Sequence, residues 1–229
     1  MEGRNLLYVV FFSGFAAAPG IAQADFYSHN YFGASFGDAT QDEFCGRVEQ
    51  NVAEIDATTA SASLRSCEDG GNLWKVFVGR HWHPNLAVEA SYTRLADATH
   101  ITDINEPAFV PPDFTRDSEV ETHMVGAYLV GHLPLHESFS LYARAGASLW
   151  QQTREINFVF IDPLFGAIRY RSNEASDGVS AAYAAGMQYT WQRSITVRAD
   201  LEKIDGIGSD ESGGETSLET VTLGLSMRF

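Results

Sequence analysis

Basic residues are scarce in this chain, which has 15 Lys and Arg against 30 Asp and Glu and a formal net charge of −15. No run of lysines and arginines occurs anywhere along its 229 residues. A chain with this balance repels phosphate backbones, so the composition disfavours nucleic-acid binding.

Cysteines are few, and long apolar runs are absent. Two Cys do not make a disulfide scaffold, and Cys45 and Cys67 lack the close C-x-x-C spacing of a zinc site. No segment approaches 18 continuous apolar residues, which excludes a helical membrane protein. The chain is nevertheless 45% hydrophobic and 12% aromatic, enough for a core or a lipid-facing surface, and its length suits a single all-β barrel.

The N-terminus has the pattern of a secretory signal. Leu6–Ala18 is almost wholly apolar, and Ala22-Gln23-Ala24 has the small-x-small pattern that signal peptidase accepts. The alternative is a transmembrane anchor, but 13 helical residues reach only ~20 Å of a ~30 Å hydrocarbon core. We therefore predict a cleaved signal peptide over 1–24 and one domain over 25–229.

The rest of the chain alternates between apolar and polar residues with a period of two, which is typical of strands with one apolar face. In the last segment, apolar residues fall at every second position from Val221 to Phe229. Eight such segments occur, near residues 29–37, 73–82, 86–96, 119–133, 139–151, 178–191, 194–204 and 218–229. Most have the ~10 residues that a tilted strand needs to cross a bilayer.

The connections between these segments alternate between short and long. Three are turns of a few residues, and the other four span 38–72, 97–118, 152–177 and 205–217. These long connections, with one flanking residue added to two of them, hold 22 acidic and 6 basic residues, essentially all of the excess charge. Short turns on one side and long loops on the other are typical of outer-membrane barrels, whereas a soluble lipocalin-like barrel would turn its apolar face inward. The prediction is an all-β, eight-stranded antiparallel up-and-down transmembrane β-barrel.

Several stretches resemble the OmpA-like outer-membrane β-barrel family, which includes opacity-type proteins. Residues 74–92 are similar to its W-K-x-F-x-G-Y-x-F-N…E-x-x-Y pattern, 141–147 to its fifth strand and 195–202 to its seventh. His81 departs from the pattern by replacing the usual Tyr, and Asp200 stands where Glu is common. The resemblance implies an eight-stranded barrel in a Gram-negative outer membrane with a structural, adhesive or host-interaction role.

The C-terminal strand resembles the family's assembly signal, which ends in Phe. Its apolar residues are Leu223, Leu225, Met227 and Phe229. The resemblance implies recognition by the barrel assembly machinery, and because no peptidoglycan-binding domain follows Phe229, anchoring to the cell wall is not expected.

Charged residues fall on the polar, inward face of the predicted strands by parity. They are Lys75, Glu89, Arg144, Arg198, Asp200, Glu202 and Arg228. Side chains fill the interior of an eight-stranded barrel, and buried charges must be paired. We expect an ion-paired plug; the alternative is a narrow passive channel gated by the same pairs.

Cys45 and Cys67 lie in the first long connection and enclose 21 residues. An exported protein meets an oxidising compartment, so we predict a disulfide that holds this loop in shape.

Aromatic residues near the predicted strand ends indicate an interfacial girdle. They are Phe32, Trp74, Trp82, Tyr92, Phe139, Trp150, Tyr189, Trp191 and Phe229.

Catalytic and metal sites have weaker support. Ser118, Glu121 and His123 are candidates for a lipid-modifying enzyme, but an odd offset puts Ser118 and His123 on opposite faces, and no G-x-S-x-G elbow occurs. The pairs His81-x-His83 and His132-x-x-x-His136 lack an obvious third ligand. The acidic loops could gather Ca²⁺ or Mg²⁺, yet they lack EF-hand spacing. We expect no enzyme activity, cofactor or metal centre.

The expected function is a structural and surface-interaction role in the outer membrane, resembling adhesion. The expected partners are outer-membrane lipid and lipopolysaccharide, the assembly machinery, and a host or surface ligand bound through the loops. We expect a monomer.

Overall fold

The computed structural model describes residues 29–41, 44–58, 61–68, 70–96, 98–105, 113–162, 166–191, 194–208 and 216–229. The predicted signal peptide lies outside these residues. One helix is present among them, and it is not of the length and apolarity that a membrane-spanning helix needs.

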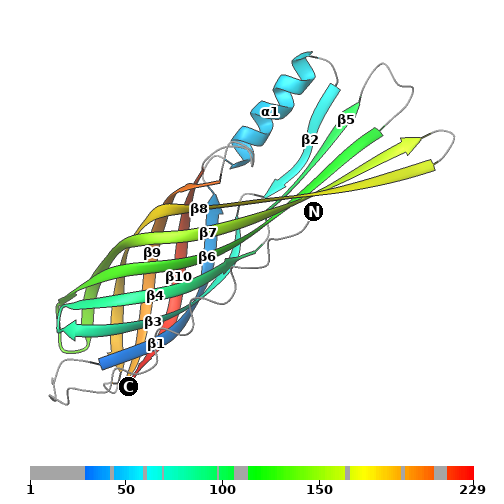
Figure 1. The fold of residues 1–229 in the computed structure, drawn as a ribbon. Coiled ribbons are helices and arrows are strands. Elements are labelled where there is room, and N and C mark those ends of the chain that lie inside the picture. Colours follow the sequence, from blue (N-terminus) through cyan, green and yellow to red (C-terminus); the bar gives the residue numbers. More distant parts are fainter. Residues whose placement is uncertain are drawn as a thin grey trace.

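Eight antiparallel strands close into a ring (Figure 1). In ring order they are β1 (His29–Gln41), β3 (Gly70–His83), β4 (Leu86–Leu95), β6 (Asp113–Pro134), β7 (Phe139–Asp162), β8 (Gly166–Trp191), β9 (Ile195–Ile207) and β10 (Thr216–Arg228). The register between β10 and β1 runs from Tyr31 opposite Arg228 to Gln41 opposite Leu218, and this pairing closes the ring. All eight predicted segments lie on these strands.

The surface of the ring is apolar and its interior is polar. On β10, Leu223, Leu225, Met227 and Phe229 are 49–69% exposed on the outside, whereas Thr220 and Thr222 are buried inside. A soluble barrel has the opposite arrangement, so the lipocalin-like alternative does not fit this structure.

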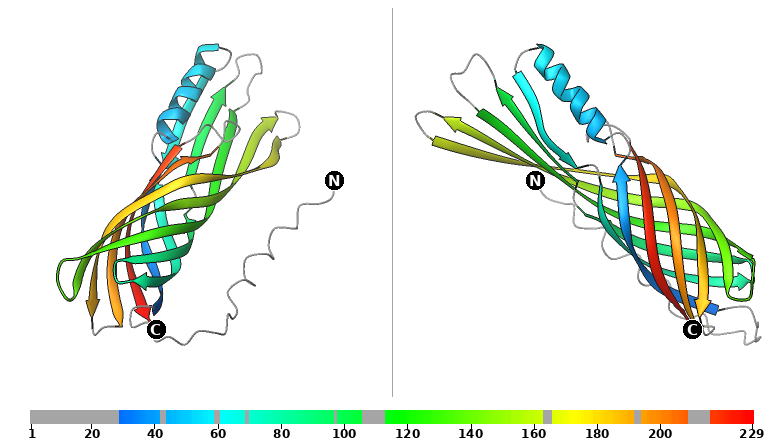
Figure 2. Two further views of the ribbon diagram at one scale, coloured as in Figure 1. Left: turned by 60° about the vertical axis from the view of Figure 1, so that its left-hand side comes forward. Right: turned by 180° about the vertical axis from the view of Figure 1, so that it is seen from behind.

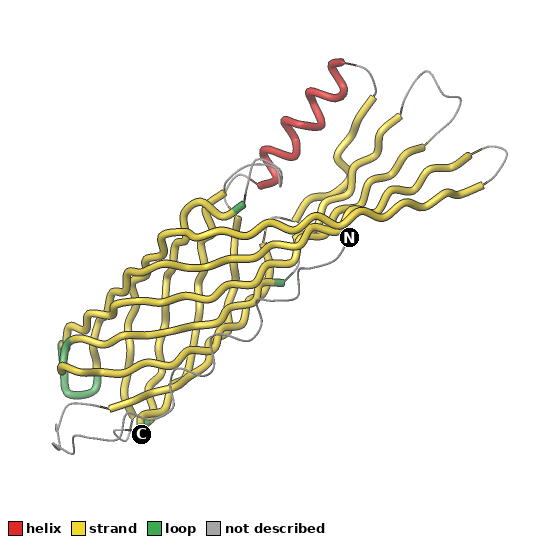
Figure 3. The backbone as a smooth tube through the Cα atoms, viewed as in Figure 1, coloured by secondary structure: helices red, strands yellow, loops and turns green. Residues whose placement is uncertain are grey.

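The two ends of the ring differ. Short turns join β3 to β4, β6 to β7 and β8 to β9 at one end, as predicted. At the other end β6, β7 and β8, which are 22, 24 and 26 residues long, continue beyond the ring (Figures 1 and 3).

The strands that leave the ring extend its sheet beyond the barrel, which corrects the expectation that residues 97–118 and 152–177 only connect barrel strands. β5 (Ala98–Asn105) pairs with the start of β6, and β2 (Ser61–Glu68) pairs with β5. The outer halves of β7 and β8 complete five strands in the order β2-β5-β6-β7-β8. Sequence alternation does not mark these parts of the chain, because polar residues occur on both faces of this extension.

Helix α1 (Phe44–Thr58) lies along β2 (Figure 2). The predicted disulfide is present: Cys45 in the first turn of α1 is bonded to Cys67 near the end of β2, with their Cα atoms 5.9 Å apart. We call the five outer strand segments and α1 together the platform. The first long connection therefore contains a helix and a strand, which its polar composition did not predict.

Exposed aromatic residues surround the ring near the strand ends, among them Trp74, Trp82, Tyr189 and Trp191. Trp150 does not belong to this girdle: it is 5% exposed and its Nε1 donates a hydrogen bond to Ser180 Oγ inside the ring. Parity explains the correction, because Leu149 is the residue of β7 that faces outward there.

Candidate functional site

An ion-pair network crosses the interior of the ring. Arg144 on β7 lies between Glu89, with Nη1 2.7 Å from Oε1, and Glu202, with Nη2 3.2 Å from Oε2. Lys75 on β3 is also paired with Glu202. These four side chains are at most 2% exposed, so strand parity alone located them correctly inside the barrel.

Arg198 on β9 extends the network. Its Nη1 lies 2.8 Å from Glu89 Oε2, and its Nε lies 3.2 Å from Asp200 Oδ2. Three cations therefore meet three carboxylates, and the network is neutral. Charges buried in an interior are tolerated only when they are paired and hydrogen-bonded, as they are here.

Tyrosines also donate hydrogen bonds to two of these carboxylates. Tyr31 on β1 donates a hydrogen bond to Glu89 Oε2 at 3.0 Å, and Tyr142 on β7 donates one to Asp200. The Tyr31 ring crosses Gly79 to reach Glu89, and a β-carbon at position 79 would overlap that ring. The W-K-x-F-x-G pattern thus has a physical role: the glycine leaves room for the tyrosine.

The network leaves little free space. Arg198 lies over the Phe77 ring at 4.2 Å and Arg144 over the Tyr128 ring at 4.9 Å, so aromatic side chains pack directly against the charges. The cavity beside Glu89 and Arg198, toward the short-turn end, measures about 20 Å³, which is room for one water molecule. The charged side chains therefore fill this cross-section.

Arg228 does not join the network, which corrects the prediction that it is one of the interior ion pairs. It is exposed near the end of β10 and forms none of the ion pairs found among the described residues. Asp200 pairs with Thr222 across β9 and β10, and Arg228 lies six residues farther along, about 20 Å away.

Histidines from three strands gather at the short-turn end. The His81 ring stacks on His29 at 4.4 Å and lies 4.7 Å from His132. The pairs considered from sequence are separated instead, since His83 and His136 are exposed while His81 is buried. Within the described ranges, no group of three or more His, Cys, Asp or Glu is arranged to hold a metal ion.

The Ser–His candidates lie on opposite faces of β6. Ser118 is fully buried and accepts a hydrogen bond from Arg154 Nε at 2.9 Å. His123 contacts Tyr92 Oη at 2.8 Å and Glu121 Oε1 at 3.1 Å on the outer surface. Ser118 and His123 therefore do not form a catalytic dyad.

The platform has an inner face, which continues the barrel interior, and an outer face. His100, Thr102 and Ser118 are buried on the inner face, whereas Arg65, Glu155 and Arg171 form exposed ion pairs on the outer face. Burial and the nearby guanidinium groups of Arg154 and Arg116 lower the pKa of His100 to about 4. His100 is therefore neutral at pH 7.

We expect the platform to lose stability as the pH falls from about 6.5 toward 4. His100 has an ordinary pKa of about 6.5 when the platform is unfolded, so the unfolded state binds the extra proton first, and the loss is at most about 3 kcal/mol. Hydrogen exchange of the β5 and β6 backbone amides, corrected for intrinsic rates, measures it. H100Q should remove this part of the pH dependence; an unchanged profile in H100Q would contradict the assignment.

Comparison with known proteins identifies the family. Residues 8–229 match the family described as Outer membrane protein beta-barrel domain. Outer membrane protein A of Shimwellia blattae is 29% identical over 97 residues, which cover 42% of this chain and 36% of that protein. The match thus spans about a third of the length of this relative.

Solved structures that resemble this protein have a lower sequence identity to it than this relative does. Ail, the attachment invasion locus protein of Yersinia pestis, crystallised with the heparin analogue sucrose octasulfate, is 17% identical, with 87% of this chain and 99% of Ail covered and a TM-score of 0.43. OprG from Pseudomonas aeruginosa is 12% identical, with 89% and 97% covered and a TM-score of 0.48. Because the family match takes in nearly the whole chain, this protein belongs to the Outer membrane protein beta-barrel domain family and is an integral protein of the Gram-negative outer membrane.

Proposed function

We propose that this protein is a surface-interaction protein, adhesin-like in role, that binds ligands through its platform. The observation that supports this is the length of β6, β7 and β8, which run for 22–26 residues. About 10 residues suffice to cross the bilayer, so roughly 12 to 16 residues of each strand, or ~40–50 Å, project beyond it. In this family the short turns are periplasmic, and the long connections are outside the cell.

The platform is ordered in a way that suits binding. Its strands are hydrogen-bonded continuations of barrel strands, and the Cys45–Cys67 bond ties α1 to β2. A binding surface held by a rigid scaffold loses less entropy on association than a flexible loop does. The barrel would then serve as the anchor.

The proposal also covers the export, domain organisation and membrane partners of the chain. Residues 1–24 are a cleaved signal, and 25–229 form one monomeric domain in contact with outer-membrane lipid and lipopolysaccharide. The row of exposed apolar residues from Leu223 to Phe229 on β10 presents the strand that the assembly machinery recognises. The protein has no enzymatic role.

Removing either of two large parts of the platform should sharply lower ligand binding and leave the barrel folded. One variant replaces residues 153–175 by Asn-Gly, which joins Gln152 to Ser176, two residues that already pair across β7 and β8. A second variant replaces residues 42–69 by Asn-Gly. Adhesion of cells that display each variant to epithelial monolayers and matrix-coated plates measures binding, and we expect a drop of at least about tenfold.

The control for this experiment changes the opposite end of the barrel. Replacing Leu135–Ser138 by Asn-Gly is similar surgery in a periplasmic turn and should leave adhesion unchanged. A heat-dependent shift in gel mobility verifies that each barrel is folded. Full adhesion without the platform, or no adhesion by the intact protein, would refute the proposal.

The channel alternative predicts discrete conductance steps in planar bilayers. We expect none from the intact protein, because the network and its aromatic neighbours fill the interior beside a cavity of only about 20 Å³. Regular steps that disappear in E89Q or R144Q would instead establish a gated pore.

A further inference from the structure

Two arginines on the inner face of the platform have no carboxylate within ion-pair distance in the part of the chain that the structure describes. Arg116 on β6 and Arg154 on β7 are each half-buried, and neither takes part in an ion pair among the described residues. This is unusual in a chain of net charge −15, most of whose acidic residues lie in the same long connections. We call these two side chains the arginine pair.

The two arginines lie close together. Arg154 Nε donates a hydrogen bond to Ser118 Oγ at 2.9 Å, and Ser118 is two residues from Arg116 on the same face of β6. The guanidinium of Arg116 lies 5.7 Å from the centre of the Phe158 ring. The Nε of Arg116 is buried without a hydrogen-bond partner, so this N–H group of the pair can still donate to a ligand.

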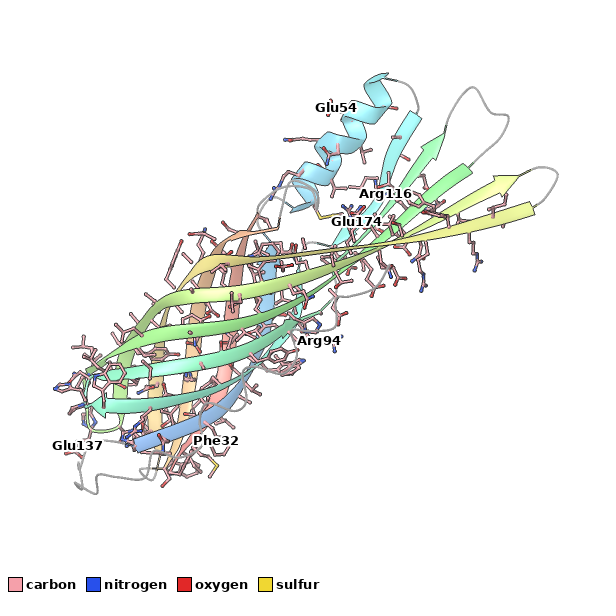
Figure 4. All side chains as sticks on the ribbon, in the orientation of Figure 1. Phe32, Glu54, Arg94, Arg116, Glu137 and Glu174 are labelled. Carbon is pink, nitrogen blue, oxygen red and sulfur yellow. A yellow bond between two sulfur atoms is a disulfide. The ribbon has the colours of Figure 1, made fainter. Side chains whose placement is uncertain are left out.

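The surroundings do not neutralise the pair. Burial lowers the pKa of both guanidinium groups, and the charge of Arg116 further lowers the pKa of Arg154. Glu174 on β8, opposite Arg154 in the register, is the carboxylate that acts on both (Figure 4). It is exposed and supplies one negative charge against two positive charges. His100 is neutral at pH 7 and adds no charge of either sign.

An external oxyanion would complete this arrangement. Guanidinium groups present forked donors that match the paired oxygens of a phosphate or sulfate, and such charge-assisted bonds strengthen when they are partly shielded from water. Flat aromatic surface flanks the arginines: Phe158 contacts Tyr170, with ring centroids 6.3 Å apart, and Tyr170 is 66% exposed. The rings offer an apolar face to the scaffold that carries the anion.

We propose that the arginine pair binds a phosphate or sulfate ester carried on a sugar. This inference rests on the proposed surface-binding function and names the ligand chemistry. Ser118 orients Arg154, the Phe158 ring holds Arg116, and the exposed Tyr170 packs against the sugar ring. Two sources supply such esters at this surface: the phosphates of lipopolysaccharide in the protein's own membrane, and sulfated glycans outside the cell.

Binding of two probes to the full-length folded protein in detergent tests the proposal. The probes are a heparin hexasaccharide and purified lipopolysaccharide, measured by calorimetry at low and moderate salt. R116Q/R154Q should weaken binding of at least one probe by about tenfold or more. E174Q should strengthen it severalfold, since it removes the competing carboxylate.

R169Q/R171Q is the matched control. It removes the same charge from the outer face of β8, on the opposite side of the platform strands from the arginine pair. We expect its affinity to stay within about threefold of the unmodified protein, because nonspecific attraction alone is a small term at moderate salt. An equal loss in both double variants would overturn a specific site. Unchanged binding by R116Q/R154Q, or no binding of either probe by the intact protein, would do so too.

The probes separate the two sources, and the variants separate this inference from the proposed function. Loss of lipopolysaccharide binding alone assigns the site to the protein's own membrane, and loss of heparin binding alone assigns it to an outside glycan. Cells that display R116Q/R154Q and still adhere fully, while cells with the platform deletions do not, would leave the proposed function intact. In that case the ligand is the protein's own lipopolysaccharide if this probe alone has lost affinity, and the ligand chemistry is refuted if neither probe has. The heat-dependent gel shift verifies folding of each variant, and the gain expected of E174Q does not depend on any loss of fold.

Discussion

E89Q should lower the free energy of unfolding of the barrel by about 3–5 kcal/mol, which is the usual effect of removing one partner from a buried ion pair. Glu89 contacts Arg144 at 2.7 Å and Arg198 at 2.8 Å, and it accepts a hydrogen bond from Tyr31. Removing its charge leaves three cations inside the barrel and only two carboxylates to balance them. The cations are Arg144, Arg198 and Lys75, and the carboxylates are Asp200 and Glu202. The remaining positive charge has no access to bulk water.

Urea unfolding of the protein in lipid vesicles, followed by tryptophan fluorescence and by gel mobility, measures this change. E121Q is the matched control: it makes the same substitution in a carboxylate paired with an arginine, Arg94, on the half-exposed outer surface. We expect E121Q to change stability by less than about 1 kcal/mol. A loss below about 1 kcal/mol in E89Q would show that the network contributes little.

A double substitution separates pairing from packing. E89L/R144M removes one charge of each sign and restores neutrality with apolar side chains of similar size. Replacement of a whole buried pair is often neutral or stabilising, so we expect this variant to recover most of the loss. A double variant as unstable as E89Q would mean that the hydrogen bond from Tyr31, rather than charge balance, dominates.

C45S/C67S should lower the stability of α1 and β2 by about 3 kcal/mol and leave the barrel unchanged. The bond closes a loop of about 20 residues, for which the chain-entropy model gives this magnitude. The helix itself adds little stability of its own: it has 15 residues, no acidic residue in its first turn and no basic residue in its last turn, so these turns carry no charge that favours the helix dipole.

Limited proteolysis and hydrogen exchange locate this effect. The variant should expose residues 44–68 to cleavage while its heat-dependent gel shift stays normal. Adding reductant to the unmodified protein should reproduce the result, which controls for the serine substitutions. Equal protection of α1 with and without the bond would contradict the prediction.

The alternation of side chains along a strand was enough to assign residues to the barrel interior, but it was not enough near the strand ends. Lys75, Glu89, Arg144, Arg198, Asp200 and Glu202 lie where alternation placed them, because each belongs to a strand with lipid on its other side. Arg228 obeys the same alternation but lies near a strand end, where the interior opens to water. Alternation gives the direction of a side chain and not its depth.

The platform shows the other limit of sequence patterns. Residues 113–118, 152–162 and 166–177 continue barrel strands, yet they carry mixed polar residues on both faces, as loops do. Helix α1 is concealed in the same way, since Val52 is the buried residue among those of its side chains that the structure describes. The arginine pair was likewise hidden, because Arg116 and Arg154 are 38 residues apart and meet only through the register of β6 and β7.

The sequence by itself determined the class of this protein: eight strands, their order, their short turns, the apolar outer surface, the charged interior and the cysteine pair. It could do so because a bilayer imposes a strict period of two on every strand that crosses it. Only the tertiary structure decided which charges pair, where the strands end and what stands outside the membrane. Those features depend on strand register and on contacts between distant segments, which leave no periodic trace in the sequence.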